Sequence, residues 1–124
     1  MNALRYGLTP KMKPISPRRS ALVAALDVGS SKVVCMIARL RPQEPQQAMT
    51  RRSHAIEVVG FGHTNARGMK AGSVVNLAQA EDAIRQAVDA AERTAGVEIE
   101  SVVLSLSAGR LASELFAADV DIVG

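Results

Sequence analysis

The sequence predicts an α/β fold in which antiparallel strands are followed by one long amphipathic helix and then by a further strand. Three observations predict it. Apolar, β-branched runs flank a short turn at Gly29, apolar residues recur at steps of three and four over Leu77–Ala95, and apolar and polar residues alternate over Ser101–Ser107. This order differs from the regular strand–helix alternation of a dinucleotide-binding domain.

The first two predicted strands form a hairpin. Ala21–Leu26 is apolar on both faces, as in a buried strand, and Lys32–Leu40 is rich in β-branched residues. Asp27–Ser31 between them has the composition of a turn. Arg41–His54 is polar and contains two prolines, so we expect a long loop at the other end of the hairpin.

A third strand is predicted over Ala55–His63. Gly60 and Gly62 within it predict a bulge or the close approach of another backbone. Thr64–Val75 has no clear period, so we expect an irregular connection there.

The helix is the clearest predicted element. Its apolar stripe consists of Leu77, Ala80, Ile84, Ala87, Val88, Ala91 and Ala95. Asn76 is the expected N-cap, Gln79 is placed to complete a variant of the capping box, and Gly96 ends the helix. Two charge pairs one turn apart support it: Glu81–Arg85 and Asp89–Arg93.

The residues after the helix continue with strand patterns. Ser101–Ser107 is predicted to be half-buried with its serines on the exposed face, and Leu111–Phe116 and Asp119–Val123 are further strand candidates. The chain has 124 residues, which suffices for one small domain and not for a two-lobed enzyme.

Charge is distributed unevenly along the chain. Residues 1–52 hold ten Lys or Arg and two acids, whereas residues 53–124 hold five Lys or Arg and ten acids, and the net charge is +3. The first twenty residues are basic and rich in proline, so we predict a disordered tail over 1–20. Contact of this tail with anionic lipid is an alternative, and contact with nucleic acid is a weaker one.

We predict structural roles for the cysteine and the two histidines. Cys35 is the only cysteine, which excludes an internal disulfide and favours a reducing, cytosolic compartment, and its apolar strand predicts a core position. His54 and His63 lack companion ligands, so we expect surface positions for both. The longest apolar run is too short to cross a bilayer, and no signal peptide is expected. The sequence shows no Ser-His-Asp or paired-carboxylate arrangement, so no catalytic residue is predicted.

The segment with the clearest chemistry is the turn between the first two strands. Gly29, Ser30 and Ser31 expose backbone N–H groups and hydroxyls that suit phosphate oxygens, and Lys32 adds a positive charge. Asp27 could hold Mg²⁺ through water. The segment is not a Walker A loop, and ordinary turn chemistry explains it equally well when it is considered alone.

Two sequence blocks resemble known proteins, the first a superfamily and the second one family within it. Residues 25–34, ALDVGSSKVV, resemble the first phosphate hairpin of the superfamily that contains actin, heat-shock chaperones and sugar kinases. Residues 58–111 are similar to FtsA, the actin-like bacterial cell-division family. The matching positions are Arg67, Gly68, Met69, Gly72, Val75, Asn76, Leu77, Ile99, Ser101, Val102, Leu104, Leu106 and Ser107.

The resemblance implies the N-terminal part of an actin-like (ribonuclease H-like) domain. Residues 21–98 would be the first part of subdomain 1A, and residues 99–124 would begin the family-specific subdomain 1C. Asp27, Gly29, Ser30, Ser31 and Lys32 would bind the β- and γ-phosphates of ATP, with Asp27 on the Mg²⁺ side.

The family's function is implied in the same way. An FtsA-like protein is an ATP-binding scaffold that links the FtsZ ring to the inner membrane, recruits later division proteins and self-associates into filaments. It is peripheral on the cytoplasmic face at the division site, and no nucleic-acid partner is expected. A sugar-kinase-like enzyme and a pilus-assembly actin-like ATPase are the alternatives.

The resemblance also implies that parts are missing. The family's second phosphate loop, adenosine-binding segment, FtsZ-binding subdomain and C-terminal membrane helix all lie beyond the matched region, so we expect a fragment. We predict that the chain alone binds ATP weakly or not at all, hydrolyses none, and is unstable or aggregation-prone.

Overall fold

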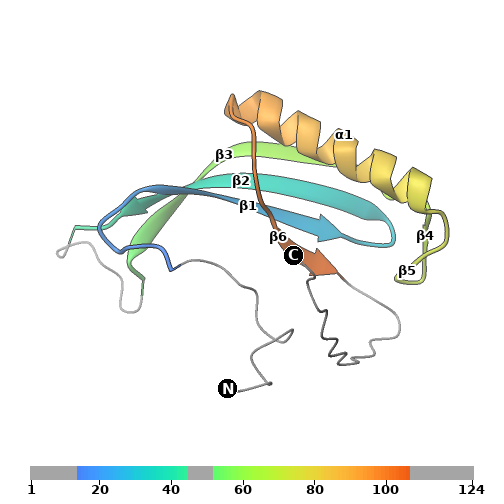
Figure 1. The fold of residues 1–124 in the computed structure, drawn as a ribbon, viewed down its shortest axis with the longest axis horizontal. Coiled ribbons are helices and arrows are strands. Elements are labelled where there is room, and N and C mark those ends of the chain that lie inside the picture. The colour runs from blue at the N-terminus through green and yellow to red at the C-terminus, as the bar shows by residue number, and fades with distance from the viewer. Residues whose placement is uncertain (1–13, 45–51, 107–124) are drawn as a thin grey trace, which may run out of the picture.

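A four-stranded sheet with one helix packed on one of its faces makes up most of the described chain (Figure 1). The computed structural model describes residues 14–44 and 52–106. The elements are β1 (Ala21–Val28), β2 (Lys32–Pro42), β3 (His54–Asn65), β4 (Met69–Lys70), β5 (Ser73–Val74), α1 (Leu77–Ala95) and β6 (Val103–Leu106). The strand order is β3-β2-β1-β6, in which β1 is antiparallel to β2 and parallel to β6, and β2 is antiparallel to β3. The predicted mixed α/β fold is confirmed at this level.

The β1–β2 hairpin is longer than its apolar runs predict. Asp27 and Val28 pair with Val34 and Val33, so the strand continues through residues expected in the turn. At the other end β2 reaches Pro42 and β3 already begins at His54, so the predicted polar loop is shorter by the residues that join the sheet. Cross-strand pairing therefore determines the strand ends, and composition alone does not reveal them.

Gly60 and Gly62 confirm both interpretations of the β3 sequence. Ile37 lies opposite Gly60 whereas Ala38 lies opposite Val58, so one residue of β3 is extra and forms a bulge. A Cβ on Gly62 would collide with the carbonyl oxygen of Ala87 and stand 2.8 Å from the Ala91 nitrogen. The helix backbone therefore packs directly against β3 at these glycines.

Helix α1 has the predicted bounds and the predicted caps. The Asn76 side chain accepts a hydrogen bond from the Gln79 N–H at 3.1 Å, and Gly96 ends the helix in the left-handed conformation at φ 69°. The capping box is not formed, because the Asn76 N–H donates to the Gly68 carbonyl oxygen instead. The Glu81–Arg85 ion pair is confirmed at 2.7 Å. Arg93, however, bonds the backbone oxygen of Asp89 and not its carboxylate.

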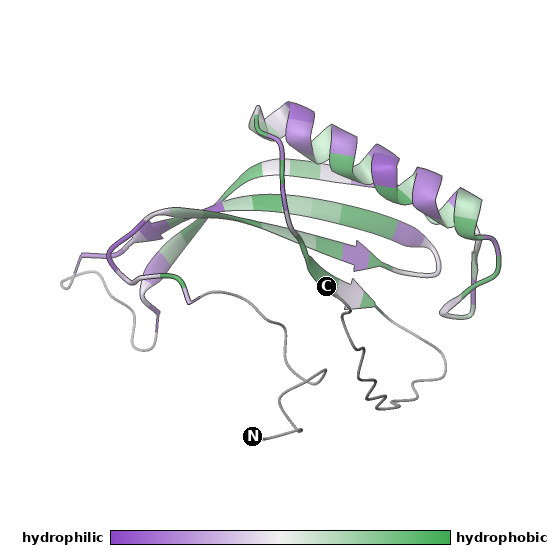
Figure 2. Cartoon of the chain, in the orientation of Figure 1, coloured by the Kyte–Doolittle hydropathy of each residue, from purple (hydrophilic) through white to green (hydrophobic). Residues whose placement is uncertain are grey.

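The core lies between α1 and the middle strands. Small helix residues face the sheet, and Ala83, which the predicted stripe omits, is among the buried ones, whereas Leu77 is 73% exposed. Cys35 and Ile37 of β2 are fully buried, which confirms the prediction for the cysteine. Figure 2 shows the green strands beneath the helix and polar residues along its outer side. The core members are Ala24, Leu26, Val28, Val33, Cys35, Ile37, Ala83, Ala87 and Ala91.

The connection predicted as irregular contains a small hairpin, β4–β5. Met69 pairs with Val74 and Lys70 with Ser73 across a turn at Ala71 and Gly72, which both have positive φ. A turn with two such residues matches the right-handed twist of flanking strands, although alanine is an unusual occupant of the first position.

Strand β6 lies beside β1 but is not half-buried as predicted. All four of its residues are exposed, including Leu104 at 58%. The reason is that α1 lies over β3 and β2 and leaves this side of the sheet uncovered. The two further strand candidates, Leu111–Phe116 and Asp119–Val123, fall outside the described residues.

His54 is buried, so its predicted surface position is wrong, whereas His63 is exposed as predicted. The Nε2 atom of His54 lies 2.8 Å from the carbonyl oxygen of Arg19, and its Nδ1 atom lies 2.8 Å from the Ser53 hydroxyl. Because the carbonyl can only accept, Nε2 carries the proton in this bond. His54 thus joins the start of β3 to the segment that enters β1.

Candidate phosphate-binding hairpin

The tip of the β1–β2 hairpin brings together the five residues predicted to bind phosphate. Asp27 ends the exposed face of β1, Lys32 begins β2, and Gly29, Ser30 and Ser31 form the turn. The Gly29 N–H donates to the Lys32 carbonyl oxygen at 2.9 Å and closes the turn. The sequence forms this turn because Gly29 leaves room there: a Cβ would stand only 3.0 Å from that same oxygen.

Several donors at the tip remain available to a ligand. Within 14–44 and 52–106, no hydrogen-bond acceptor takes the N–H of Ser30 or Ser31, and both residues are exposed. The Lys32 side chain is exposed beside them. Adjacent free N–H groups, hydroxyls and an ammonium group form a donor set that fits the oxygens of a phosphate group.

Two segments that the sequence did not connect to the site support this tip. The Gly72 N–H donates to the Ser30 hydroxyl oxygen at 2.7 Å, and the Ala66 N–H donates to the Ser31 carbonyl oxygen at 2.9 Å. The Ser30 hydroxyl proton is therefore directed away from Gly72. No pattern in the sequence indicated this contact, because the Ala-Gly pair at the β4–β5 turn signals a turn and not its partner.

The glycines of the Arg-Gly-Met segment have a local structural explanation. Gly68 has φ 68°, and its carbonyl oxygen accepts from the N–H groups of Val75 and Asn76 at 2.8 and 3.1 Å. A Cβ on Gly68 would collide with the Asn76 carbonyl oxygen. Gly68 thus fixes how the β4–β5 hairpin leads into the helix, while Gly72 fixes its contact with Ser30.

The site lies where two parallel strands end together. Val28 of β1 is level with Leu106 of β6, and Asp27 is level with Ser105. Ligands of α/β proteins bind outside the carboxyl ends of parallel strands, and the hairpin tip occupies such a position.

Asp27 is an exposed carboxylate on the sheet face opposite α1. Among the residues that the structure describes, no group of three or more His, Cys, Asp or Glu side chains is arranged to hold a metal ion. A single carboxylate suits Mg²⁺ that retains most of its water shell and is held chiefly by ligand phosphates, so Asp27 fits the water-mediated role.

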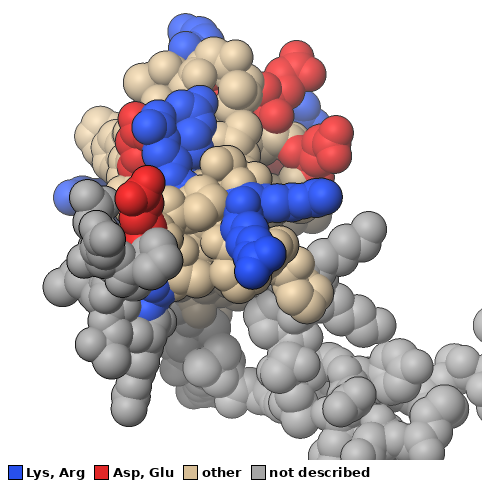
Figure 3. All heavy atoms as spheres, turned by 90° about the vertical axis from the view of Figure 1, so that its left-hand side faces the viewer, with Lys and Arg blue, Asp and Glu red and all other residues tan. Residues whose placement is uncertain are grey.

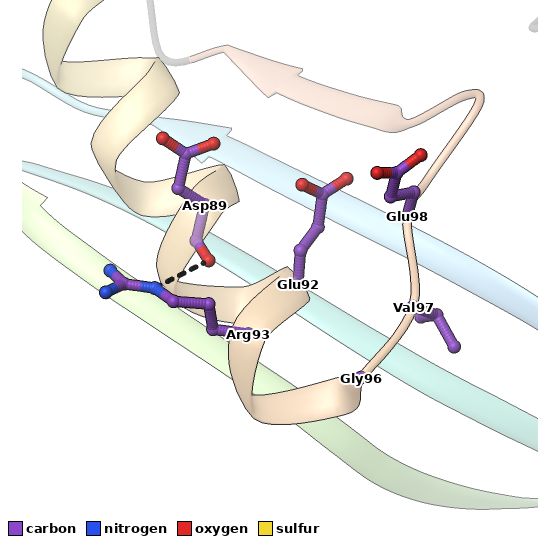
Figure 4. Close-up of a pocket in the computed structure, with 6 residues that line it drawn as sticks. All are labelled: Asp89, Glu92, Arg93, Gly96, Val97 and Glu98. Atoms are coloured by element: carbon purple, nitrogen blue, oxygen red, sulfur yellow. Dashed lines mark hydrogen bonds between the residues drawn. The ribbon is translucent and has the colours of Figure 1, made fainter.

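A second concave region lies at the end of α1 (Figure 4). It is lined by Asp89, Glu92, Arg93, Gly96, Val97 and Glu98. Glu92 has a structural role there, because its Oε1 atom accepts a 2.8 Å hydrogen bond from the Ile99 N–H and so connects the helix to the chain leading into β6. This region gives no further candidate site.

The fold and the candidate site are compatible with one class of protein. A mixed α/β sheet with a helix on one face and a Gly-Ser-Ser-Lys turn at one end of its two central strands is compatible with part of an actin-like domain. Among the described elements, no helix is long and apolar enough to span a membrane.

Comparisons with known proteins give the family. The chain is 46% identical over 119 residues to cell division protein FtsA of Agrobacterium fabrum and 48% identical over 119 residues to that of Rhizobium meliloti. Each match covers 96% of this chain and 27% of the relative. FtsA of Pseudomonas aeruginosa is 30% identical over 98 residues, covering 79% of this chain and 21% of the relative. No protein-family model matches. The chain belongs, over the matched residues, to the FtsA family of cell division proteins.

Proposed function

We propose that the β1–β2 hairpin is the phosphate-binding side of an ATP·Mg²⁺ site in an actin-like cell-division scaffold. The observation that carries this proposal is the hairpin tip, where the N–H groups of Ser30 and Ser31 lie exposed beside Lys32. Ser31 and Lys32 would bind phosphate oxygens directly, Ser30 would donate its hydroxyl proton, and Asp27 would orient a water of the Mg²⁺ shell.

The wider role rests on the relatives. The chain spans about a quarter of the length of the FtsA proteins that it matches, 27% for the first of them. We propose that the matched region is the start of subdomain 1A followed from residue 99 by subdomain 1C. We also propose that the protein links the FtsZ ring to the inner membrane, recruits later division proteins and forms filaments. A fluorescent fusion of the native gene product that stays dispersed in cells with an assembled FtsZ ring would exclude this role.

The phosphate site can be tested on the chain itself by nuclear magnetic resonance. We expect ATP·Mg²⁺ to shift the amide signals of Ser30, Ser31 and Lys32 with an affinity of about 1 mM, which is roughly −4 kcal/mol. One loop supplies only part of the contacts that hold a nucleotide, so tight binding is not expected.

A matched pair of variants makes the test specific. The double variant Ser31→Ala, Lys32→Ala removes a hydroxyl and a cation at the tip and should abolish the shifts. Thr94→Ala, Arg93→Ala likewise removes a hydroxyl and a cation, at the far end of α1, and should preserve the shifts. Shifts that survive the first double variant, or an equal loss of shifts in the two double variants, would overturn the proposed site. Micromolar affinity would contradict the prediction that the chain alone binds ATP weakly or not at all.

A further inference from the structure

The end of the sheet opposite the candidate phosphate site is rich in arginine. β1 begins there, β2 ends there and β3 begins there, as the register of Leu22 with Arg39 and of Pro42 with His54 shows. Figure 3 looks onto this end and shows basic side chains spread over it, with acidic side chains among them. The described arginines that these strand ends carry are Arg18, Arg19, Arg39, Arg41 and Arg52. We call them the arginine end.

Acids lie at this end of the sheet as well, but three of its arginines are unpaired within residues 14–44 and 52–106. Arg41 pairs with Glu57 at 2.8 Å, Glu44 follows β2, and Glu98 and Glu100 lie beside the start of β1. Within the described ranges, no carboxylate lies within salt-bridge distance of Arg18, Arg19 or Arg52, and all three residues are exposed. The residues that precede the described chain, 1–13, add further cations and no acid to the charge of this half of the sequence.

The position of the arginine pair at the entrance to β1 is fixed by the fold. The buried His54 ring bonds the Arg19 carbonyl oxygen at 2.8 Å, and the Arg19 N–H bonds the Ser16 carbonyl oxygen at 3.1 Å. The backbone of Arg19 is therefore attached to His54 at the start of β3, two residues after Arg52. Neither arginine side chain is needed for these bonds.

We propose that the arginine end binds the surface of an anionic lipid bilayer. Arginines arranged over the ends of three strands match a broad array of lipid phosphates, and such an array requires charge and no shaped groove. Recognition of single-stranded nucleic acid uses aromatic side chains for base stacking, and none of the described residues around these strand ends is Phe, Tyr or Trp. Sequence-specific reading of a duplex uses a helix or a strand ribbon that enters a groove, and here the strands meet the surface end-on.

The test is co-sedimentation of the chain with lipid vesicles. We expect binding to vesicles of phosphatidylcholine with about one-third phosphatidylglycerol and little binding to phosphatidylcholine alone, with the affinity falling as salt is raised through about 150 mM. Replacing both Arg18 and Arg19 by alanine should weaken binding by about 25-fold, since each surface cation contributes about fivefold.

A control variant separates a local surface from overall charge. The double variant Arg85→Ala, Arg93→Ala changes the net charge equally but lies on α1, and it should leave vesicle binding within about twofold of the unchanged chain. Equal losses in the two double variants, or equal binding to neutral and anionic vesicles, would overturn the proposal. Tighter binding to random-sequence duplex DNA than to anionic vesicles at the same salt would also overturn it and assign the surface to nucleic acid. None of these outcomes bears on the candidate phosphate site, which lies at the other end of the sheet.

Discussion

Single residues of this protein often serve two neighbouring elements at once. Ser30 is exposed at the candidate phosphate site, and it also accepts the Gly72 N–H at 2.7 Å. A hydroxyl that accepts on one side still has its own proton to donate on the other. Ser30 is therefore the residue through which a bound phosphate would contact the β4–β5 hairpin.

Cys35 is the residue whose ionisation should be detected in stability measurements. Burial, and secondarily the negative charge of Glu92, raise the pKa of its thiol above the ordinary value of 9.0. The folded protein therefore keeps its thiol proton at a pH where the unfolded chain loses it. The thiol's contribution to stability is complete below pH 9.0 and is lost as the pH rises toward the folded-state pKa.

We expect the free energy of unfolding to fall as the pH rises above 9.0, by up to about 1.4 kcal/mol per pH unit. Urea unfolding of the chain and of Cys35→Ala over this pH range is the measurement. The alanine variant has no thiol to ionise, so its curve should be flatter by this amount. The same slope in both proteins would show that other groups cause the loss.

At the scale of elements, the seam between α1 and β3 depends on the absence of side chains. A Cβ on Gly62 would collide with the Ala87 carbonyl oxygen and would approach the Ala90 Cβ atom at 2.9 Å. We expect Gly62→Ala to lower the free energy of unfolding by about 1–3 kcal/mol, because the helix must move away from the strand. Urea unfolding followed by helix circular dichroism measures this loss.

The control for this variant is the next residue along the strand. His63 points to the uncovered face of the sheet and is exposed, so His63→Ala should change stability by no more than about 0.5 kcal/mol. A Gly62→Ala protein as stable as the His63→Ala protein would mean that the seam is not packed as described.

The elements that the sequence predicted well are those determined by local chemistry. Leu77–Ala95 has a helical stripe, an N-cap and a glycine stop, and the helix has those bounds. The turn at Gly29 is likewise local. The hairpin contact of Gly72 with Ser30 joins segments far apart in the sequence, so no local pattern indicates it.

The predictions that were wrong concern residues whose burial depends on a neighbouring element. Leu104 and Leu106 alternate with serines as in a half-buried strand, yet both are exposed because α1 does not reach β6. His54 has no local partner pattern, and it is buried because the Arg19 carbonyl oxygen meets its ring. In both cases burial is determined by tertiary contacts, which periodicity does not encode.

At the scale of the whole molecule, the main consequence of this architecture is an apolar sheet face that no helix or strand of residues 14–44 and 52–106 covers. The face opposite α1 carries Met36 of β2, Phe61 of β3 and Val103 of β6, which are 37%, 46% and 36% exposed. Ile56 and Val58 extend it along β3. An apolar face of this kind is a site for association or aggregation.

We expect the isolated chain to self-associate through this face. Sedimentation velocity should show a mass that rises with concentration, and the double variant Val58→Glu, Phe61→Glu should return the chain to a monomer. Leu77→Glu is the matched control, because Leu77 is 73% exposed but lies on α1, away from this face. A monomeric unchanged chain, or equal relief by the control, would contradict the expectation.

The parallel pairing of β1 with β6 has a consequence for the order of folding. β1, β2 and β3 join neighbours in sequence through hairpins, whereas Ala25 meets Val103 only after the whole helix has been placed between them. Contacts between residues distant in sequence require a larger loss of chain entropy before the contacts themselves stabilise the fold, so they form late. On a ribosome the three-stranded meander and its helix can assemble first, and β6 docks last. The carboxyl edge of the β1–β6 pair, and with it the complete surroundings of Asp27, is therefore the final part of the described structure to form.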